Sequence, residues 1–292
     1  MAYPSLRSRI GTCLYGGIGT FALLRVPDGW SPVFLVGCAR SGTTITIDLM
    51  RTHRQIQVLD EPRHIWRAVS PITDIWAPGV VERGGRIEMD ETLVTSDLAA
   101  RCRRMFYGRH LLSQRKILIE KLPINSFRIR FLQSIFGNSS FIHLIRHGLE
   151  VANSIRRTGP KWYGRNDGWR WLSLCEIAQK AGMAKSFLSG CHSAVEKGLV
   201  EWTLCVEACR TARKDKVSAG YLELRYEDLL SDPASMFQDI AGFLDVTPDD
   251  RLLAAARSQL DRRNPSAAEL TWPKNIHEKT VQLLRDLDYS SP

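Results

Sequence analysis

Short apolar runs alternate with longer amphipathic stretches along most of the chain, and this pattern predicts strands that alternate with helices. The predicted strands fall at residues 33–36, 56–59, 117–119, 141–145 and 221–225. The predicted helices fall at residues 43–53, 98–112, 126–136, 148–157, 169–187, 198–213, 233–244, 248–259 and 276–287. Such alternation predicts an α/β fold, a mainly parallel sheet with helices on both faces.

Length and composition bear on the domain organisation. The chain has 292 residues, and no Pro-, Ser- or Gly-rich linker divides it. We therefore expect one domain over residues 32–292, preceded by an N-terminal extension over residues 1–31. Within the extension, the uncharged run of residues 10–24 is 15 residues long, which is short for a membrane span of about 20. We expect it to pack on the domain or to move freely, in preference to touching a membrane interface.

Charge and cysteine content narrow the class of partner. Forty Lys and Arg against 31 Asp and Glu give a net charge of +9. A solvated basic surface would explain this excess, and so would a groove that attracts a polyanionic small molecule. Nucleic acid is not favoured, because the basic residues are scattered and no nucleic-acid module is present. Seven cysteines without a C-x-x-C pattern favour reduced thiols and a cytoplasmic location over zinc or disulfides.

The first candidate site is the loop from Gly37 to Gly42, which follows an apolar strand and precedes a predicted helix. Backbone N–H groups in such a loop, together with the helix N-terminus, bind phosphate. The G-x-x-x-x-G spacing matches a nucleoside-triphosphatase loop, but Thr43 stands where that loop has Lys, and the cation lies inside the loop as Arg40. This favours a phosphate-bearing donor whose reacting group is not a magnesium-bound triphosphate.

The second candidate site is the apolar strand that ends at Arg146, followed by a turn and a helix that carries Ser154. Both side chains can reach one anion in the crevice above a parallel sheet. Taken alone, this motif would be better explained as a solvated loop charge and a serine on a helix surface.

Together these two motifs resemble the PAPS-dependent sulfotransferase family, which has a P-loop fold and uses 3′-phosphoadenosine 5′-phosphosulfate (PAPS). The style is closest to carbohydrate-type, tyrosylprotein-type and bacterial members. The resemblance implies that the first loop binds the 5′-phosphosulfate through Arg40, Ser41, Gly42, Thr43 and Thr44. It also implies that Arg146 and Ser154 hold the 3′-phosphate. A later stretch, residues 222–233, resembles the family's late strand and turn, where the Tyr, here Tyr226, lies against the adenine.

The same resemblance implies the catalytic groups. Glu61, after a likely second strand, would be the base that takes the acceptor proton, although it could instead cap a turn or pair with Arg63. Lys121, at the end of another strand, would contact the leaving phosphate oxygen together with Arg40. Asp60 and His64 are the neighbours that could replace Glu61. For Lys121, the alternative is a surface lysine paired with Glu120.

Two parts of the family pattern are missing or hard to place. The late R-K-G-x-x-G-x-W loop of cytosolic members is absent, which leaves Arg263 and Lys274 as uncertain last contacts of the nucleotide. The acceptor region is indicated only by aromatic residues beside basic ones, at residues 161–163 and 169–171. Residues 62–97, with Trp66 and Trp76, have the composition of a mobile substrate loop.

These observations predict a sulfotransferase that moves a sulfuryl group from PAPS to an acceptor hydroxyl and releases 3′,5′-ADP. We expect no metal ion, because a transferred sulfuryl group carries less charge than a phosphoryl group and protein cations suffice. A carbohydrate or glycolipid acceptor is the first choice, ahead of a small metabolite and of protein tyrosine. The alternatives are a small-molecule or nucleotide kinase that needs magnesium and ATP, and a non-catalytic nucleotide-binding protein. The oligomeric state is not indicated.

Overall fold

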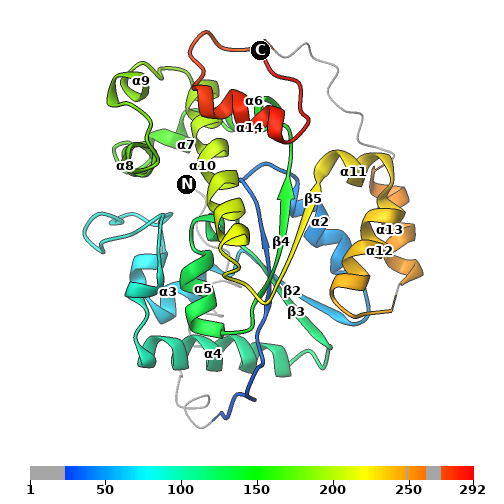
Figure 1. Ribbon diagram of the computed structural model, residues 1–292. Coiled ribbons are helices and arrows are strands. Elements are labelled where there is room, and N and C mark those ends of the chain that lie inside the picture. The colour runs from blue at the N-terminus through cyan, green and yellow to red at the C-terminus, as the bar shows by residue number, and fades with distance from the viewer. Residues whose placement is uncertain (1–23, 248, 261–270) are drawn as a thin grey trace.

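A computed structural model describes residues 24–247, 249–260 and 271–292. Its five strands form one parallel sheet in the order β2-β3-β1-β4-β5, with the first strand in the middle (Figure 1). The strands are β1 (Val33–Val36), β2 (Ile56–Asp60), β3 (Ile117–Lys121), β4 (Ser140–Ile145) and β5 (Gly220–Arg225). All five predicted strands are confirmed. Residues 1–23 of the predicted extension, and Arg263, lie outside the described residues.

Helices cover both faces of the sheet, as predicted. The α-helices are α2 (Thr43–Met50), α3 (Arg63–Val69), α4 (Ser96–Leu111), α5 (Ile129–Phe136), α6 (Gly148–Arg156), α7 (Lys161–Gly164), α8 (Trp169–Lys180), α9 (Lys185–Ser189), α10 (Ala194–Lys214), α11 (Tyr226–Ser231), α12 (Pro233–Phe243), α13 (Asp250–Leu260) and α14 (Glu278–Asp286). Short 3-10 turns are η2 (Pro71–Thr73), η3 (Glu91–Leu93) and η4 (Pro123–Phe127). Helices α2, α12 and α13 lie to the right of the sheet in Figure 1, and α4, α5 and α10 lie to its left. Two separate buried clusters, one on each face, form the core.

Two helix predictions need correction. The helix predicted at residues 169–187 is two helices, α8 and α9, because Gly182 has a φ of +88° and ends the first of them. The last long helix of the left layer, α10, begins earlier than predicted. Ser193 and Glu196 form a reciprocal capping box there, which satisfies the free N–H groups of the first turn.

Residues 62–97, predicted to be a mobile substrate loop, are anchored to the domain. The buried guanidinium of Arg128 donates to the main-chain oxygens of Thr73, Arg86 and Ile87. Burial lowers the pKa of Arg128 to about 9, opposed by the charges of Glu120 and Asp74. These hydrogen bonds attach the segment to the domain at residues 73, 86 and 87, and its predicted mobility stays a prediction.

Candidate active site

The first loop has the backbone that its two glycines allow. Gly37 has a φ of +147°, and a Cβ there would lie 2.3 Å from the carbonyl oxygen of Leu144. The N–H of Gly37 donates to the Ser126 hydroxyl at 2.9 Å. Gly42 has a φ of +96°, and a Cβ there would lie 2.1 Å from the Tyr226 ring. The loop therefore runs tightly between β4 and the start of α11, where only glycine fits.

This loop has the properties of an anion cradle. Gly42 caps α2 without a side-chain hydrogen bond, so the first N–H groups of that helix lack a capping partner. The Ser41 side chain is buried, and its hydroxyl oxygen has no hydrogen-bond partner among the described residues. Free N–H groups, a helix N-terminus and an unpartnered hydroxyl suit a phosphate group, as the sequence predicted. Thr43 and Thr44 follow in the first turn of α2.

The second motif meets the first loop directly. The Nε of Arg40 donates to the Ser154 hydroxyl oxygen at 3.1 Å, and these residues are 114 positions apart. A guanidinium nitrogen of Arg146 lies 3.5 Å from the Arg40 carbonyl oxygen, and its Nε donates to Glu150 at 2.8 Å. Two cations and a buried hydroxyl thus converge beside the loop, from the ends of β1 and β4 and from α6.

Tyr226 joins the two motifs. Its side chain is buried, one side of the ring lies against Gly42, and the guanidinium carbon of Arg146 lies 4.6 Å from the ring centre. The ring thus has a packing role, and its predicted contact with adenine stays a prediction. Lys274, which was named with Arg263 as an uncertain last contact of the nucleotide, is exposed.

A cluster near the C-terminus supports this end of the site, which the sequence analysis missed. Glu227 accepts a hydrogen bond from the main-chain N–H of His147 at 3.0 Å and from the Tyr289 hydroxyl at 2.7 Å. The His147 ring contacts the Tyr289 ring edge-on, and its Nε2 lies 3.0 Å from the Ser290 hydroxyl. His147 follows Arg146 and Glu227 follows Tyr226, so these contacts fix the backbone next to each member of the Arg146–Tyr226 pair.

The predicted catalytic pair is assembled at the ends of β2 and β3. The Nζ of Lys121 lies 2.7 Å from an Asp60 oxygen, 3.2 Å from a Glu61 oxygen and 3.3 Å from the Thr44 hydroxyl. Asp60 and Lys121 are register partners on neighbouring parallel strands, so the sheet itself brings them together. The Lys121 side chain is 1% exposed, which excludes the alternative of a surface lysine.

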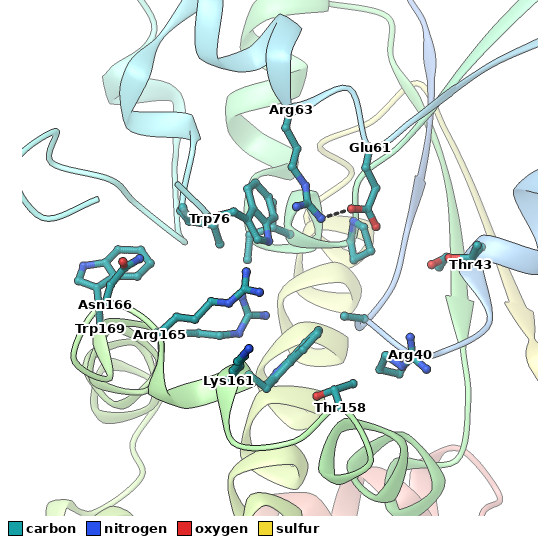
Figure 2. Close-up of a pocket in the computed structure, with 17 residues that line it drawn as sticks. Arg40, Thr43, Glu61, Arg63, Trp76, Thr158, Lys161, Arg165, Asn166 and Trp169 are labelled. Atoms are coloured by element: carbon teal, nitrogen blue, oxygen red, sulfur yellow. Dashed lines mark hydrogen bonds and ion pairs between the residues drawn. The ribbon is translucent and has the colours of Figure 1, made fainter. Parts of the chain in front are cut away.

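Glu61 adopts a left-handed backbone, with a φ of +44°. Its N–H donates to the Lys121 carbonyl oxygen at 2.7 Å, and this bond continues the strand pairing through the turn. The carboxylate also forms an ion pair with Arg63, and Figure 2 shows the two side chains facing one another. Burial alone would raise the pKa of Glu61, but the charges of Arg63 and Lys121 and their hydrogen bonds outweigh burial and lower it. Glu61 therefore forms the ion pair with Arg63 that the sequence offered as an alternative, and it also lies in the candidate site.

Glu120 precedes Lys121 on β3, so its carboxylate points to the opposite face of the sheet. It accepts hydrogen bonds from the Trp66 indole at 2.8 Å and from the Asn125 amide at 3.0 Å. Burial raises its pKa to about 8, and those two hydrogen bonds oppose the rise. Glu120 thus anchors α3 and η4 to β3 and does not pair with Lys121.

A cavity of about 340 Å³ lies between the first loop, the start of α3, and the segment that contains α7 and the start of α8. Glu61 lines it, whereas Asp60 and His64 do not. This favours Glu61 among the three candidates for the base. Three tryptophans, Trp76, Trp162 and Trp169, line the cavity and give it broad apolar walls, and Figure 2 labels the rings of Trp76 and Trp169.

Residues 158–170 form the wall opposite Glu61. Three of their side chains bind the same buried carboxylate. Glu201 of α10 is 1% exposed and accepts from the Trp162 indole at 3.1 Å and from the Tyr163 hydroxyl at 2.9 Å. Arg170 forms an ion pair with it and lies over the Trp162 ring at 4.9 Å. The sequence indicated the aromatic residues here but gave no sign of their common partner.

The described residues contain no group of three or more His, Cys, Asp or Glu side chains placed to hold a metal ion. None of the helices in this part of the chain is long and apolar enough to cross a membrane.

Comparison with known proteins agrees with this geometry. The model of the sulfotransferase family matches residues 32–250. A protein-tyrosine sulfotransferase A from Caenorhabditis elegans is 22% identical over 236 residues, which cover 79% of this chain and 55% of that protein. An uncharacterized protein from Aquifex aeolicus is 28% identical over 270 residues, 87% of this chain and 30% of that protein. The chain thus spans only about a third to a half of these relatives.

Solved structures share the fold at low sequence identity. Sulfotransferase STF9 from Mycobacterium avium has a TM-score of 0.56 at 14% identity, over 97% of this chain and 82% of that one. The sulfotransferase domain from the curacin biosynthetic pathway has a TM-score of 0.55 at 16% identity, over 92% of this chain and 100% of that domain. The sulfotransferase domain of the Synechococcus PCC 7002 olefin synthase has a TM-score of 0.54 at 18% identity, over 92% and 99%.

Proposed function

This chain belongs to the sulfotransferase family, and from that premise we propose that it transfers the sulfuryl group of PAPS to an acceptor hydroxyl. The observation that carries the proposal is the hydrogen bond between Arg40 and Ser154 at 3.1 Å. It joins the phosphate loop to the second motif, so that one nucleotide with phosphates on both the 5′- and the 3′-oxygen of its ribose can contact both. A nucleoside triphosphate has its phosphates on one side only and would leave Arg146 and Ser154 unused.

The proposed reaction assigns a task to each group. The loop from Arg40 to Thr44 binds the 5′-phosphosulfate, and Arg146 and Ser154 bind the 3′-phosphate. Glu61 takes the proton of the acceptor hydroxyl as its oxygen attacks sulfur. The bond between sulfur and the bridging phosphate oxygen breaks, and Lys121 and Arg40 stabilise the charge that develops on that oxygen. The products are the sulfate ester and 3′,5′-ADP.

The acceptor that we propose is a carbohydrate or glycolipid hydroxyl. The indole rings of Trp76, Trp162 and Trp169 that line the cavity supply flat apolar surfaces of the kind that stack on sugar rings. We also propose a cytoplasmic location, because seven cysteines without a C-x-x-C pattern suit a reducing compartment.

Calorimetric titration of 3′,5′-ADP into metal-free protein tests the donor site. We expect wild type to bind, and Arg146→Ala to weaken binding by about 1.5–3 kcal/mol, the usual effect of losing a hydrogen bond to a charged group. Arg257→Ala, on the exposed side of α13, is the matched control and should bind as wild type does. Transfer of radioactive sulfate from PAPS to a panel of sugars then tests catalysis.

Absence of 3′,5′-ADP binding by folded wild type would overturn the proposal. In that case thermal stabilisation by magnesium-ATP would favour the kinase alternative. No stabilisation by either nucleotide would favour a non-catalytic protein.

A further inference from the structure

The side chains that line the cavity are strongly biased in charge. The lining includes five cations, Arg40, Arg63, Lys161, Arg165 and Arg170, against one carboxylate, Glu61. A concave site with one sign of charge attracts ligands of the opposite sign. The cations available to bind an acceptor are those that are not already paired with other groups of the protein.

Three of the five cations already have partners within the protein. Arg63 forms an ion pair with Glu61, and its guanidinium carbon lies 4.2 Å from the centre of the Trp76 ring. Arg170 forms an ion pair with the buried Glu201. Arg40 lies in the phosphate loop and donates to Ser154, so it belongs to the donor end.

Lys161 and Arg165 are different. Within the described residues, neither side chain has a carboxylate within 4.0 Å or a hydrogen-bond partner. Both are exposed at the cavity mouth. Figure 2 shows them on the side of the cavity opposite Glu61 and Arg63, with Trp76 and Trp169 beside them.

The local backbone presents both cations to the cavity. Lys161 starts the short helix α7, and its neighbour Trp162 is fixed by Glu201. Arg165 follows α7 and precedes a turn in which Asn166, Asp167 and Gly168 all have positive φ values of 52–79°. Residue types that tolerate this conformation build the turn, so the turn sets where Arg165 leaves the backbone.

We propose that the acceptor is an anionic sugar, and that Lys161 and Arg165 bind its carboxylate or sulfate group while its hydroxyl faces Glu61. This inference rests on the proposed function and names the acceptor class more closely. Stacking on the tryptophan rings would hold the sugar ring, and the two cations would choose the charged sugar over a neutral one of the same shape.

Ligand-observed NMR titrations at saturating 3′,5′-ADP test the inference by binding, without turnover. The probes are methyl β-glucoside, methyl β-glucuronide and the 6-sulfate ester of the glucoside. At carbon 6 they carry a neutral hydroxyl, a carboxylate and a sulfate, respectively. Wild type should bind at least one anionic probe about tenfold more tightly than the glucoside, as expected for two charge pairs at a partly exposed site. The preference should weaken as ionic strength rises from about 0.01 to 0.15 M, because the screening length falls from about 30 to 8 Å.

The double variant Lys161→Gln/Arg165→Gln should lose the preference and keep its affinity for the glucoside. The control double variant Lys185→Gln/Arg257→Gln removes the same charge from exposed positions outside the cavity lining and should keep the preference. Equal binding of all three probes by wild type, including no detectable binding of any, overturns the inference. So does a preference that survives in the Lys161/Arg165 variant.

Titration of 3′,5′-ADP separates this failure from failure of the donor assignment. If wild type binds 3′,5′-ADP but shows no anion preference, only the acceptor inference falls. If the Lys161/Arg165 variant loses affinity for 3′,5′-ADP, the two cations belong to the donor and the inference is overturned. If wild type does not bind 3′,5′-ADP, the proposed function fails, and the sugar titrations are then read without nucleotide.

Discussion

The ammonium group of Lys121 lies 3.2 Å from a carboxylate oxygen of Glu61, although one residue ends a strand and the other begins the turn after the neighbouring strand. The N–H of Glu61 also donates to the carbonyl oxygen of Lys121 at 2.7 Å. The two groups that the proposed reaction needs at its two ends, a base and a cation, are thus fixed to one another by main chain as well as by charge.

Replacing Lys121 by methionine keeps the volume of this buried side chain and removes its charge. We expect kcat to fall by about 10²–10³-fold, the effect of losing one group that stabilises developing charge. The affinity for 3′,5′-ADP should also fall, because the oxygen that Lys121 contacts is fully charged in this product, but binding should persist through the loop and Arg146. Lys116→Met, next to the other end of the same strand, is the control, since Lys116 pairs with the exposed Asp245. A Lys121→Met enzyme with normal kcat would remove this residue from the mechanism.

The lowered pKa of Glu61 makes a prediction about pH. Because the charge of Arg63 helps to lower this pKa, the carboxylate stays ionised to lower pH, and the acid limb of kcat/KM should lie below the ordinary glutamate value of about 4.3. Arg63→Gln should move that limb to higher pH. Arg67→Gln, an exposed arginine of the same helix that pairs with Asp74, should leave it in place.

The same pH profiles decide between the neighbouring carboxylates. Glu61→Gln should abolish the acid limb and reduce kcat by about 10²–10⁴-fold, as expected for loss of a general base. Asp60→Asn, which removes a partner of Lys121 outside the cavity lining, should have the smaller effect. The reverse order of effects would transfer the role of base to Asp60.

Gly42 offers a test of the packing that joins the two motifs. A Cβ at this position would lie 2.1 Å from the Tyr226 ring, and φ is +96°. We expect Gly42→Ala to lower the free energy of unfolding by about 2–4 kcal/mol, because strain and overpacking add, and to abolish binding of 3′,5′-ADP. Gly242→Ala in α12, where a Cβ would meet nothing within 4 Å, should be neutral or stabilise by up to about 1 kcal/mol. Urea denaturation measures both, and equal stabilities would show that the loop can move away from the ring.

The Tyr289 hydroxyl is linked to the proposed donor site through Glu227. Tyr289→Phe removes the 2.7 Å hydrogen bond and leaves the ring contact with His147. We expect a loss of about 1–3 kcal/mol in the free energy of unfolding, as for a hydrogen bond to a charged group, and a several-fold weaker affinity for 3′,5′-ADP. Tyr107→Phe, at a ring that packs on Trp30, is the control. Unchanged 3′,5′-ADP affinity in Tyr289→Phe would mean that this cluster serves stability alone.

Much of this site was predictable, because its donor end is built from strand ends. Arg146 and Lys121 each follow an apolar run of the chain, and the carboxyl ends of parallel strands meet at one edge of a sheet. The pattern of strands and the glycine spacing therefore predicted the crevice, and the resemblance to sulfotransferases implied which of its side chains take part. Among the strands, β1 was the clearest to predict because all four of its residues are apolar, whereas polar residues such as Gln57 and His143 interrupt others.

The rest depends on contacts between distant segments, which no local pattern encodes. Glu201 lies in the middle of α10, and its partners precede it by 31–39 residues. Arg128 looked like any other basic residue, yet it attaches residues 62–97 to the domain by binding carbonyl groups at residues 73, 86 and 87. The composition of that segment is typical of a loop and does not indicate this attachment.

The wall of residues 158–170 supplies seven of the side chains that line the cavity, and none of them comes from the sheet. The groups assigned to the donor, in contrast, stand on the phosphate loop, at the end of β4 and on helices α2, α6 and α11. Under the proposed function, most of the side chains that face the acceptor therefore lie in one continuous stretch of chain, and Trp76 adds a ring from outside that stretch. Exchanging residues 158–170 between family members should therefore transfer acceptor preference, provided that Glu201 is kept to bind Trp162, Tyr163 and Arg170.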